Sequence, residues 1–423
     1  MVIVQGARVN ATGVTNGGYR QVSARPLDFK HLNELNIENK TMRLRDLGIV
    51  IGTGKPGVNN AITDVPGVRV GHHTLNTQSG EISIHTGVTV IEPRAVAAHL
   101  EPCFAGVHVL NGNGDATGLE WIREAGLLTT PIAYTNTHSV GVVRDTLVAA
   151  EREMGKQHTY WCMPVVLETY DGILSDIWDQ HVTAEHVQLA LKDARSGPVQ
   201  EGCVGGGTGM ICHEFKGGIG TASRVLSAEQ GGWTVGVLVQ ANYGARSSLR
   251  VAGYPVGTVL KDVPSPYDGP VNVGVPGMGS IVITIATDAP LLPHQCTRLA
   301  QRASVGLARV GGGTEDDSGD IFIAFSVGNT GLPVANLGHP GTPTTALQMV
   351  NNDYISALFV AAADAVEEAI VNAMLAADDL EGRGRRALAL KPAQLLSAMK
   401  KVGWQPEFTP GPAKTAGTAP TGI

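Results

Sequence analysis

Residues 263–287 read VPSPYDGPVNVGVPGMGSIVITIAT, in which a segment rich in proline and glycine gives way to a β-branched run at Gly279-Ser280. The run predicts a buried strand that ends before Asp288 and Pro290. A serine at the first position of such a strand, directly after a glycine, is where a self-cleaving hydrolase would place its nucleophile. Backbone scission there would give Ser280 a free α-amine with a pKa of about 8, so that one residue supplies nucleophile and base. An ordinary loop that ends in a strand has the same pattern. The rest of the chain must therefore distinguish a self-cleavage site from such a loop.

Strand-like and helix-like segments alternate along the chain. We expect strands at 48–52, 87–93, 163–170, 233–242, 280–287 and 320–327, and helices at 116–126, 140–155, 184–194, 292–310 and 353–377. Several of the strands are apolar at consecutive positions, which is typical of sheets covered on both faces. The alternation predicts an α/β fold.

The two ends of the chain differ from the part between them. Residues 1–42 lack sustained periodicity and are interpreted as an extension. Residues 404–423 have the Pro/Gly/Thr/Ala character of a disordered tail. No linker divides the remainder, which we interpret as a single domain over 43–403.

Composition excludes several classes of protein. With 43% hydrophobic residues the chain is globular, and with only 16% charged residues it has few charges to cover its surface, which favours an oligomer. A net charge of −7 without a Lys/Arg cluster argues against a nucleic-acid partner. The five scattered cysteines indicate reduced thiols, and no stretch approaches twenty apolar residues. We therefore expect a soluble, cytoplasmic protein with no membrane partner.

Glycine-rich and metal-like motifs do not predict a cofactor. Residues 52–57 match G-x-G-x-x-G, but no helical pattern follows them to cradle a phosphate. Residues 205–209 read GGGTG without the Gly-Lys-Ser/Thr of a P-loop, so close backbone packing explains them better. Cys203, Cys212 and His213 lack zinc spacing, and a structural histidine is the simpler interpretation.

Ser318 and Asp320 form a candidate polar pair next to the strand at 320–327. Residues two apart on an extended segment point to the same side, so a hydroxyl and a carboxylate there could relay a proton to or from Ser280. An ordinary turn is the alternative.

Three further polar residues end strands. Asn242 could present its side-chain amide to a developing oxyanion. Glu168 could bind a substrate ammonium group, and the phenol of Tyr170 could donate a hydrogen bond. The structural alternatives are that Asn242 is an ordinary turn residue and that Glu168 and Tyr170 lie at a solvent-exposed strand end.

Taken in order, these segments resemble the DmpA-like family of serine peptidases, which comprises L-aminopeptidase D-amidase/D-esterases and β-peptidyl aminopeptidases. The resemblance runs from about Arg43 to Trp404. It is carried by LRDLGIVIGTGKPGVNNAITDVPGVRVGH, LNGNGDATGLEWI, TNTHSVGVVRDT, PVVLETYDG, GGGTGMICHEFKGGIGTASR, LVQANYG and GSIVITIATDAPLLPHQ.

The resemblance implies a four-layer αββα sandwich like that of N-terminal nucleophile hydrolases, usually a homotetramer. It implies self-cleavage between Gly279 and Ser280 into an α-chain of residues 1–279 and a β-chain of residues 280–423. It also implies Ser280 as nucleophile, Ser318 and Asp320 as its polar partners, and Asn242 as oxyanion donor.

For the substrate, the resemblance implies that Glu168 holds the free amine and that Tyr170 lines the site. The expected substrates are small peptides, amides or esters with a free amino group, and the reaction requires no metal or organic cofactor. This chain has Asp320 where some members of the family carry glutamate. The resemblance therefore leaves open whether the carboxylate of Asp320 extends far enough to relay a proton.

Two alternative functions remain open. One is acyl transfer to an amine, as in ornithine acetyltransferase-like proteins, although those use threonine where this chain has Ser280. The other is a non-catalytic homologue. The sequence does not distinguish L-, D- and β-amino substrates, or the freed α-amine from the Ser318/Asp320 pair as the base.

Overall fold

The β-branched run at 280–287 lies within strand β11 (Gly277–Thr287), which has a neighbouring strand on each side in a six-stranded sheet. The computed structural model describes residues 42–80, 82–155, 161–268, 273–334 and 341–406, so most of the predicted extension and tail lies outside the described residues. The strands of this sheet, in spatial order, are β4 (Leu127–Leu128), β3 (Cys103–Gly112), β12 (Ser318–Ser326), β11, β10 (Thr234–Gly244) and β9 (Gly218–Val225).

Strand β11 is apolar on both faces because each face is covered. Ile281 and Ile283 belong to the core under the helices, whereas Val282 belongs to the core between the two sheets. This alternation follows from the two-residue repeat of a strand. β11 pairs parallel to β12 and antiparallel to β10.

A second sheet of four strands stacks on the first. Its spatial order is β1 (Arg69–Ser79), β2 (Ile82–Glu92), β5 (Ile132–Asn136) and β6 (Val165–Thr169). Tyr134 and Leu167 from this sheet share a core with Leu238, Val282 and Ile323 of the larger one. β6 lies directly against β11 across that core.

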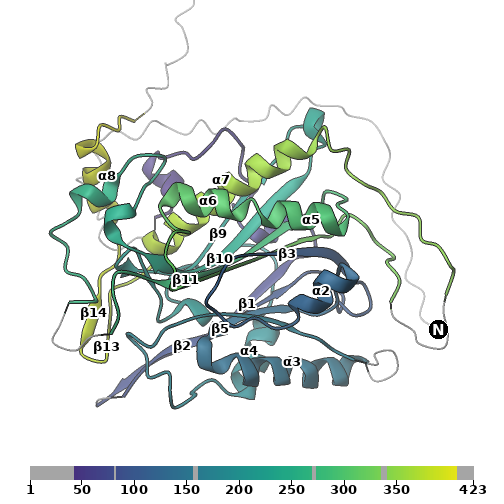
Figure 1. Ribbon diagram of the computed structural model, residues 1–423, viewed down its shortest axis with the longest axis horizontal. Helices are drawn as coiled ribbons and strands as arrows, with labels where there is room; N and C mark the ends of the chain where they lie inside the picture. The colour runs from purple at the N-terminus through teal and green to yellow at the C-terminus, as the bar shows by residue number, and fades with distance from the viewer. Residues whose placement is uncertain (1–41, 81, 156–160, 269–272, 335–340, 407–423) are drawn as a thin grey trace, which may run out of the picture. The chain divides into compact units, whose positions relative to one another are not determined.

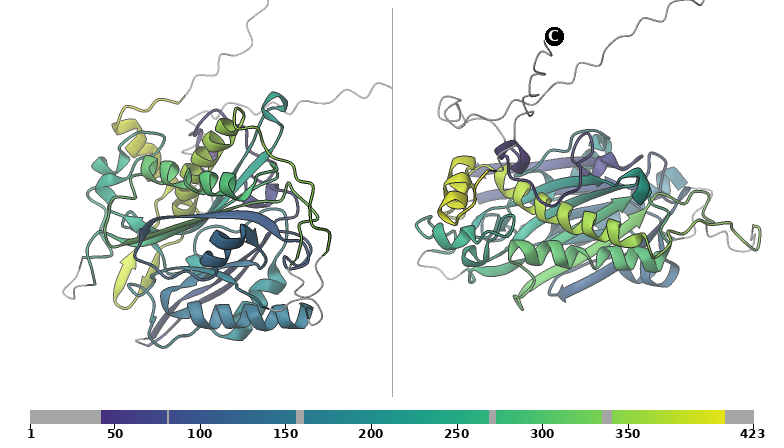
Figure 2. Two further views of the ribbon diagram at one scale, coloured as in Figure 1. Left: turned by 45° about the vertical axis from the view of Figure 1, so that its right-hand side comes forward. Right: turned by 90° about the horizontal axis from the view of Figure 1, so that it is seen from above.

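Helices cover the outer face of each sheet, as Figure 1 shows. The larger sheet carries α5 (Pro293–Ala300), α6 (Ala303–Val310) and α7 (Ile355–Leu375), which cross it in the view from above in Figure 2. The smaller sheet carries α3 (Val140–Gly155) and α4 (Ala184–Asp193). The order of layers is therefore helix, sheet, sheet, helix, which confirms the predicted αββα sandwich.

Helix α7 packs closely on β9 and β10. A Cβ placed at Gly220 of β9 would lie 2.0 Å from the carbonyl oxygen of Ala369 in α7, so only glycine allows this approach. The small alanine side chains of the helix complete the contact.

Three details differ from the sequence-based expectations. Residues 48–52 form no strand; Ile49 and Ile51 instead pack into the core beneath α7 as irregular chain. The helix expected over 292–310 is two helices, α5 and α6, which keep one apolar face because both cover the same sheet. β11 begins at Gly277, so Ser280 is the fourth residue of its strand and not the first.

The end of the described chain also bears on the predicted boundaries. Trp404, which the composition assigned to the tail, is buried in the core after helix α8 (Pro392–Lys401). Of the helices within the described ranges, none has the length and apolar character needed to cross a membrane.

Candidate active site

Five of the predicted site residues meet in one cavity of about 490 Å³, located where β6, β10 and β11 come together. They are Glu168, Tyr170, Asn242, Gly279 and Ser280. The remaining lining residues are Asn113, Gly114, Asp115, Thr137, Ile173, Tyr267, Val273, Met278 and Asp317. Both sheets contribute, so neither alone could form this site.

Ser280 lies directly opposite Asn242 in the antiparallel ladder of β10 and β11. Ser280 lies on the same strand face as Val282, and Asn242 on the same face as Leu238, two residues of the intersheet core; both side chains therefore point between the sheets and toward the cavity. Ser280 is only 4% exposed, and within the described part of the chain no group forms a hydrogen bond with its Oγ. The hydroxyl is thus buried, unpaired and open to the cavity.

The amide of Asn242 has a fixed orientation. Its Oδ1 accepts from the backbone N–H of Ile211 at 2.8 Å, and its Nδ2 donates to the carbonyl oxygen of Tyr170 at 2.9 Å. A backbone N–H can only donate and a carbonyl can only accept, so this network determines which side-chain atom is nitrogen. The second Nδ2 hydrogen is left for the cavity.

Gly279 has φ +142, in the region that disfavours side chains. A Cβ at this position would lie 1.9 Å from the carbonyl oxygen of Asn242. The peptide bond before Ser280 therefore requires glycine both for its conformation and for its contact with β10.

Glu168 occupies the end of β6 on the opposite wall of the cavity. Its Oε1 accepts from the backbone N–H of Asp115 at 2.8 Å, and its Oε2 accepts from the hydroxyl of Thr137. Burial raises the pKa of the Glu168 carboxyl, and these two hydrogen bonds partly oppose the rise. A buried carboxylate with fixed oxygens suits a cationic ligand, whose charge would favour the ionised form.

Tyr170 lies at the cavity rim and is 41% exposed. A Cβ on Gly172 would lie 2.3 Å from the phenol oxygen, so Gly172 makes room for the side chain. The backbone carbonyl of Tyr170 also orients Asn242, so this residue contributes to the site twice.

Ser318 and Asp320 form the expected pair, with Ser318 Oγ donating to Asp320 Oδ1 at 2.6 Å. β12 places Ser318 beside Gly279 and Asp320 beside Ile281. Both share the parity of Phe322, which lies in the core under the helices. The pair therefore flanks the backbone at the Gly279-Ser280 bond from the helix side, whereas the Ser280 hydroxyl points to the intersheet side.

The Asp320 carboxyl is 1% exposed, and its Oδ2 has no hydrogen-bond partner among the residues that the structure describes. Burial raises its pKa to about 6; the Ser318 hydroxyl opposes the rise and the Glu315 carboxylate adds to it. Asp320 is therefore a group that can exchange a proton near neutral pH.

Asp115 and Thr137 hold Glu168 but were not singled out from the sequence. Both follow strand ends, Asp115 after β3 and Thr137 immediately after β5, the parallel neighbour of β6. The sequence offered one signal for both residues: each is a polar residue that follows a buried strand, and each lies within a motif that carries the family resemblance.

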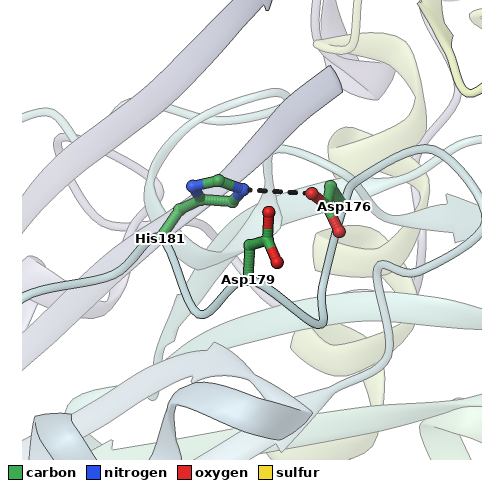
Figure 3. A group of neighbouring side chains, drawn as sticks. All are labelled: Asp176, Asp179 and His181. Atoms are coloured by element: carbon green, nitrogen blue, oxygen red, sulfur yellow. Dashed lines mark hydrogen bonds and ion pairs between the residues drawn. The ribbon is translucent and has the colours of Figure 1, made fainter. Parts of the chain in front are cut away.

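A group of possible metal ligands lies apart from the cavity residues in the loop after β6 (Figure 3). Ligand atoms of Asp176, Asp179 and His181 lie within 4.8 Å of one another, and His181 Nε2 is 3.4 Å from Asp176 Oδ2. Asp179 is exposed, and nothing else among the neighbouring residues that the structure describes indicates a bound ion. We therefore assign no metal site here. His213 is structural as expected: its ring packs on Tyr243, and burial lowers its pKa to about 4.

Comparisons with known proteins agree with this geometry. The profile of peptidase family S58 matches residues 60–387. The β-peptidyl aminopeptidase BapA of Sphingosinicella microcystinivorans is 46% identical over 372 residues, which cover 85% of this chain and 92% of that protein.

Two solved structures are similar throughout. A β-aminopeptidase of Burkholderia sp. shares 74% identity with a TM-score of 0.83, covering 86% of this chain and 100% of that one. The L-aminopeptidase D-Ala-esterase/amidase of Ochrobactrum anthropi, described as a serine aminopeptidase and a variant of the Ntn hydrolase fold, shares 42% identity with a TM-score of 0.77 over 86% and 99% of the two chains. This chain therefore belongs to peptidase family S58, as an aminopeptidase with the Ntn hydrolase fold.

Proposed function

We propose that this protein cleaves itself before Ser280 and then uses Ser280 as the nucleophile of an aminopeptidase. One observation carries the proposal: the unpaired Ser280 hydroxyl opens into a cavity that also holds an oriented amide, Asn242, and a buried carboxylate, Glu168. These three groups supply a nucleophile, an oxyanion donor and an amine anchor.

The self-cleavage would begin with attack of Ser280 Oγ on the carbonyl carbon of Gly279. An ester bond forms between these atoms, the Gly279–Ser280 C–N bond breaks, and the proton of the hydroxyl passes to the departing nitrogen. Water then hydrolyses the ester, which leaves a carboxylate on Gly279 and a free α-amine on Ser280. Glycine at position 279 supports this step, because it has no Cβ to obstruct the approach of Oγ to its carbonyl carbon.

We further propose a division of roles for the base. The freed α-amine belongs to the same residue as Oγ and takes its proton. The Ser318/Asp320 pair flanks the backbone of that residue from the other side of the sheet, so it would hold the amine in position and exchange its proton.

In each turnover Glu168 would bind the ammonium group of the substrate while Ser280 attacks the carbonyl that follows. The oxyanion accepts the free Nδ2 hydrogen of Asn242, the leaving group departs with a proton, and water releases the acyl group from Ser280. Substrates without a free amine would lack the anchor.

For the substrate class we propose amides and short peptides with an N-terminal β-amino residue. Similarity to two proteins named for β-peptide or β-amino substrates supports this choice, and the one at 74% identity supports it most. The homotetramer and the cytoplasmic setting remain predictions from the sequence.

Intact-mass spectrometry of freshly purified protein tests the proposal. The wild-type chain should convert with time to fragments 1–279 and 280–423, and Ser280→Ala should stay whole, while Ser304→Ala on α6 should convert as wild type does. Processed enzyme is then assayed on β-alanine, L-alanine and D-alanine p-nitroanilides. An uncleaved wild-type chain, or cleavage in Ser280→Ala, would refute the mechanism; preference for an α-amino substrate would refute only the substrate class.

A further inference from the structure

Lys216, in the short strand β8 (Phe215–Lys216), has a completely buried ammonium group. Its Nζ donates to three backbone carbonyls: Met210 at 2.7 Å, Gly217 at 3.1 Å and Gly207 at 3.4 Å. Carbonyls only accept, and a neutral amine has two hydrogens, so three such partners favour the protonated form. Burial lowers the pKa of Lys216, and the neighbouring Cys203, Cys212 and Asp171 oppose that lowering.

A buried charge is costly unless its surroundings compensate it, so this lysine needs an explanation. Its shortest contact provides one. The carbonyl oxygen of Met210 accepts from Lys216 Nζ and from the backbone N–H of Gly217 at 2.8 Å. The same peptide unit ends in the N–H of Ile211, which donates to Oδ1 of Asn242 at 2.8 Å.

These contacts form one continuous chain from the ammonium to the cavity. It runs from Lys216, which only donates, through the Met210–Ile211 peptide to the amide of Asn242; the peptide and the amide each accept at oxygen and donate at nitrogen. In a low-dielectric interior each such bond polarises the next, and a cation at one end strengthens the donor at the other. That last donor lines the cavity into which Ser280 opens, where the proposed attack would develop negative charge.

We propose that Lys216 is a positioning residue for the oxyanion donor, acting through the Met210–Ile211 peptide to fix and polarise the amide of Asn242. This inference rests on the proposed role of Asn242. It differs from a purely structural role because it requires the ammonium charge to affect the transition state and not substrate binding, which depends on Glu168 on another strand.

The test is a double-mutant cycle on processed enzyme with β-alanine p-nitroanilide. Lys216→Met should lower kcat on the order of tenfold with KM unchanged, because a weakened donor loses part of the transition-state stabilisation. In an Asn242→Ala background the same substitution should have almost no further effect. Tyr134→Phe is the matched control: it removes another fully buried polar contact, to Thr284, and should leave kcat unchanged.

The outcomes separate the inference from the function on which it depends. If Asn242→Ala alone leaves kcat unchanged, the oxyanion role of Asn242 is wrong. If Asn242→Ala lowers kcat but Lys216→Met lowers it again by its full factor, or raises KM alone, only the present inference is wrong.

A second measurement covers variants that fold poorly or turn over too slowly. Lys216→Arg keeps the charge, and in the uncleaved Ser280→Ala chain the Nδ2 proton resonances of Asn242 can be identified by their loss in Asn242→Ala. These resonances should shift in Lys216→Gln, which loses the charge but can still donate to a carbonyl, and stay closer to their original positions in Lys216→Arg and Tyr134→Phe. Unshifted resonances in Lys216→Gln would overturn the inference.

Discussion

Asn242 and Ser280 face each other across the antiparallel pair β10/β11, and both side chains point into the space between the sheets. In the proposed mechanism, the strand paired with that of the nucleophile thus provides the donor for the negative charge that forms during its attack. Because both belong to one hydrogen-bonded ladder, their separation is set by strand spacing and not by a mobile loop.

Replacing Asn242 with alanine should lower kcat by about 10²- to 10³-fold with little change in KM, the effect typical of losing one oxyanion donor. Steady-state kinetics on fully processed protein measures this. Tyr134→Phe again provides the comparison for a buried polar group outside the cavity. A tenfold rise in KM at constant kcat would show instead that Asn242 binds the substrate.

Replacing Gly279 with alanine should slow self-cleavage, because the new Cβ would collide with the carbonyl oxygen of Asn242 at a backbone angle that costs about 1–3 kcal/mol for a side chain. The fraction of intact chain over time, measured by mass, gives the rate. Gly253→Ala is the matched control, since Gly253 also has positive φ but open space around it. Equal rates for both variants would mean that the contact with Asn242 is unimportant.

Replacing Glu168 with glutamine should lower kcat/KM for substrates with a free amine by roughly 10- to 150-fold, since a hydrogen bond to a charged group contributes about 1.5–3 kcal/mol. Self-cleavage should proceed normally, because the Gly279-Ser280 bond presents no free amine. Glu381→Gln, at an exposed carboxylate, is the control. Unchanged kcat/KM in Glu168→Gln would remove the anchor role.

The activity of wild-type enzyme should also fall as the pH decreases through the raised pKa of Glu168, since only the ionised carboxylate attracts an ammonium group. The loss should appear in kcat/KM. In Glu168→Gln this acidic limb should disappear from the profile, and its persistence would assign the limb to another group.

Replacing Asp320 with asparagine should stabilise the protein at neutral pH while lowering kcat. Its pKa is about 6 in the folded chain and 3.8 in the reference state, so the folded state binds more protons between these values. The free energy of unfolding of the wild type therefore falls as pH rises through this window, by on the order of 2–3 kcal/mol.

Asp320→Asn removes that contribution, so its advantage over wild type should be present above pH 6 and vanish near pH 4. Thermal unfolding at several pH values checks this. Asp316→Asn, at an exposed carboxyl nearby, should follow the wild type at every pH. A pH-independent difference would contradict the assignment.

The sequence predicted the strands that carry chemistry better than the chain that only covers them. Runs such as 233–242 and 280–287 are long, rich in β-branched residues and buried on both faces. Their sequence pattern therefore predicts a strand without knowledge of the neighbouring elements. Residues 48–52 have a similar composition, but they pair with no strand of the described chain. Composition alone does not reveal whether a partner strand is present. The break between α5 and α6 was missed because the apolar face continues across it.

The candidate site was predictable residue by residue but not as an arrangement. Pairing of Ser318 with Asp320 follows from their spacing, whereas the sheet face on which they lie depends on the register of β12 against β11. The Glu168 partners Asp115 and Thr137 come from other strands and require the tertiary fold. Lys216 was not predicted as part of the site, since no local pattern shows that it contacts the peptide next to Asn242.

The order of strands in the larger sheet has a consequence for how the cleaved protein could refold. If the chain is cut before Ser280, β12 and the part of β11 from Ser280 onward belong to one fragment, yet they lie between β3 and β10 of the other. The two fragments would then be interleaved within a single sheet that was assembled when they were one chain. Denatured mature enzyme would have to rebuild that sheet as a bimolecular reaction, so its unfolding should be practically irreversible whereas that of Ser280→Ala is not.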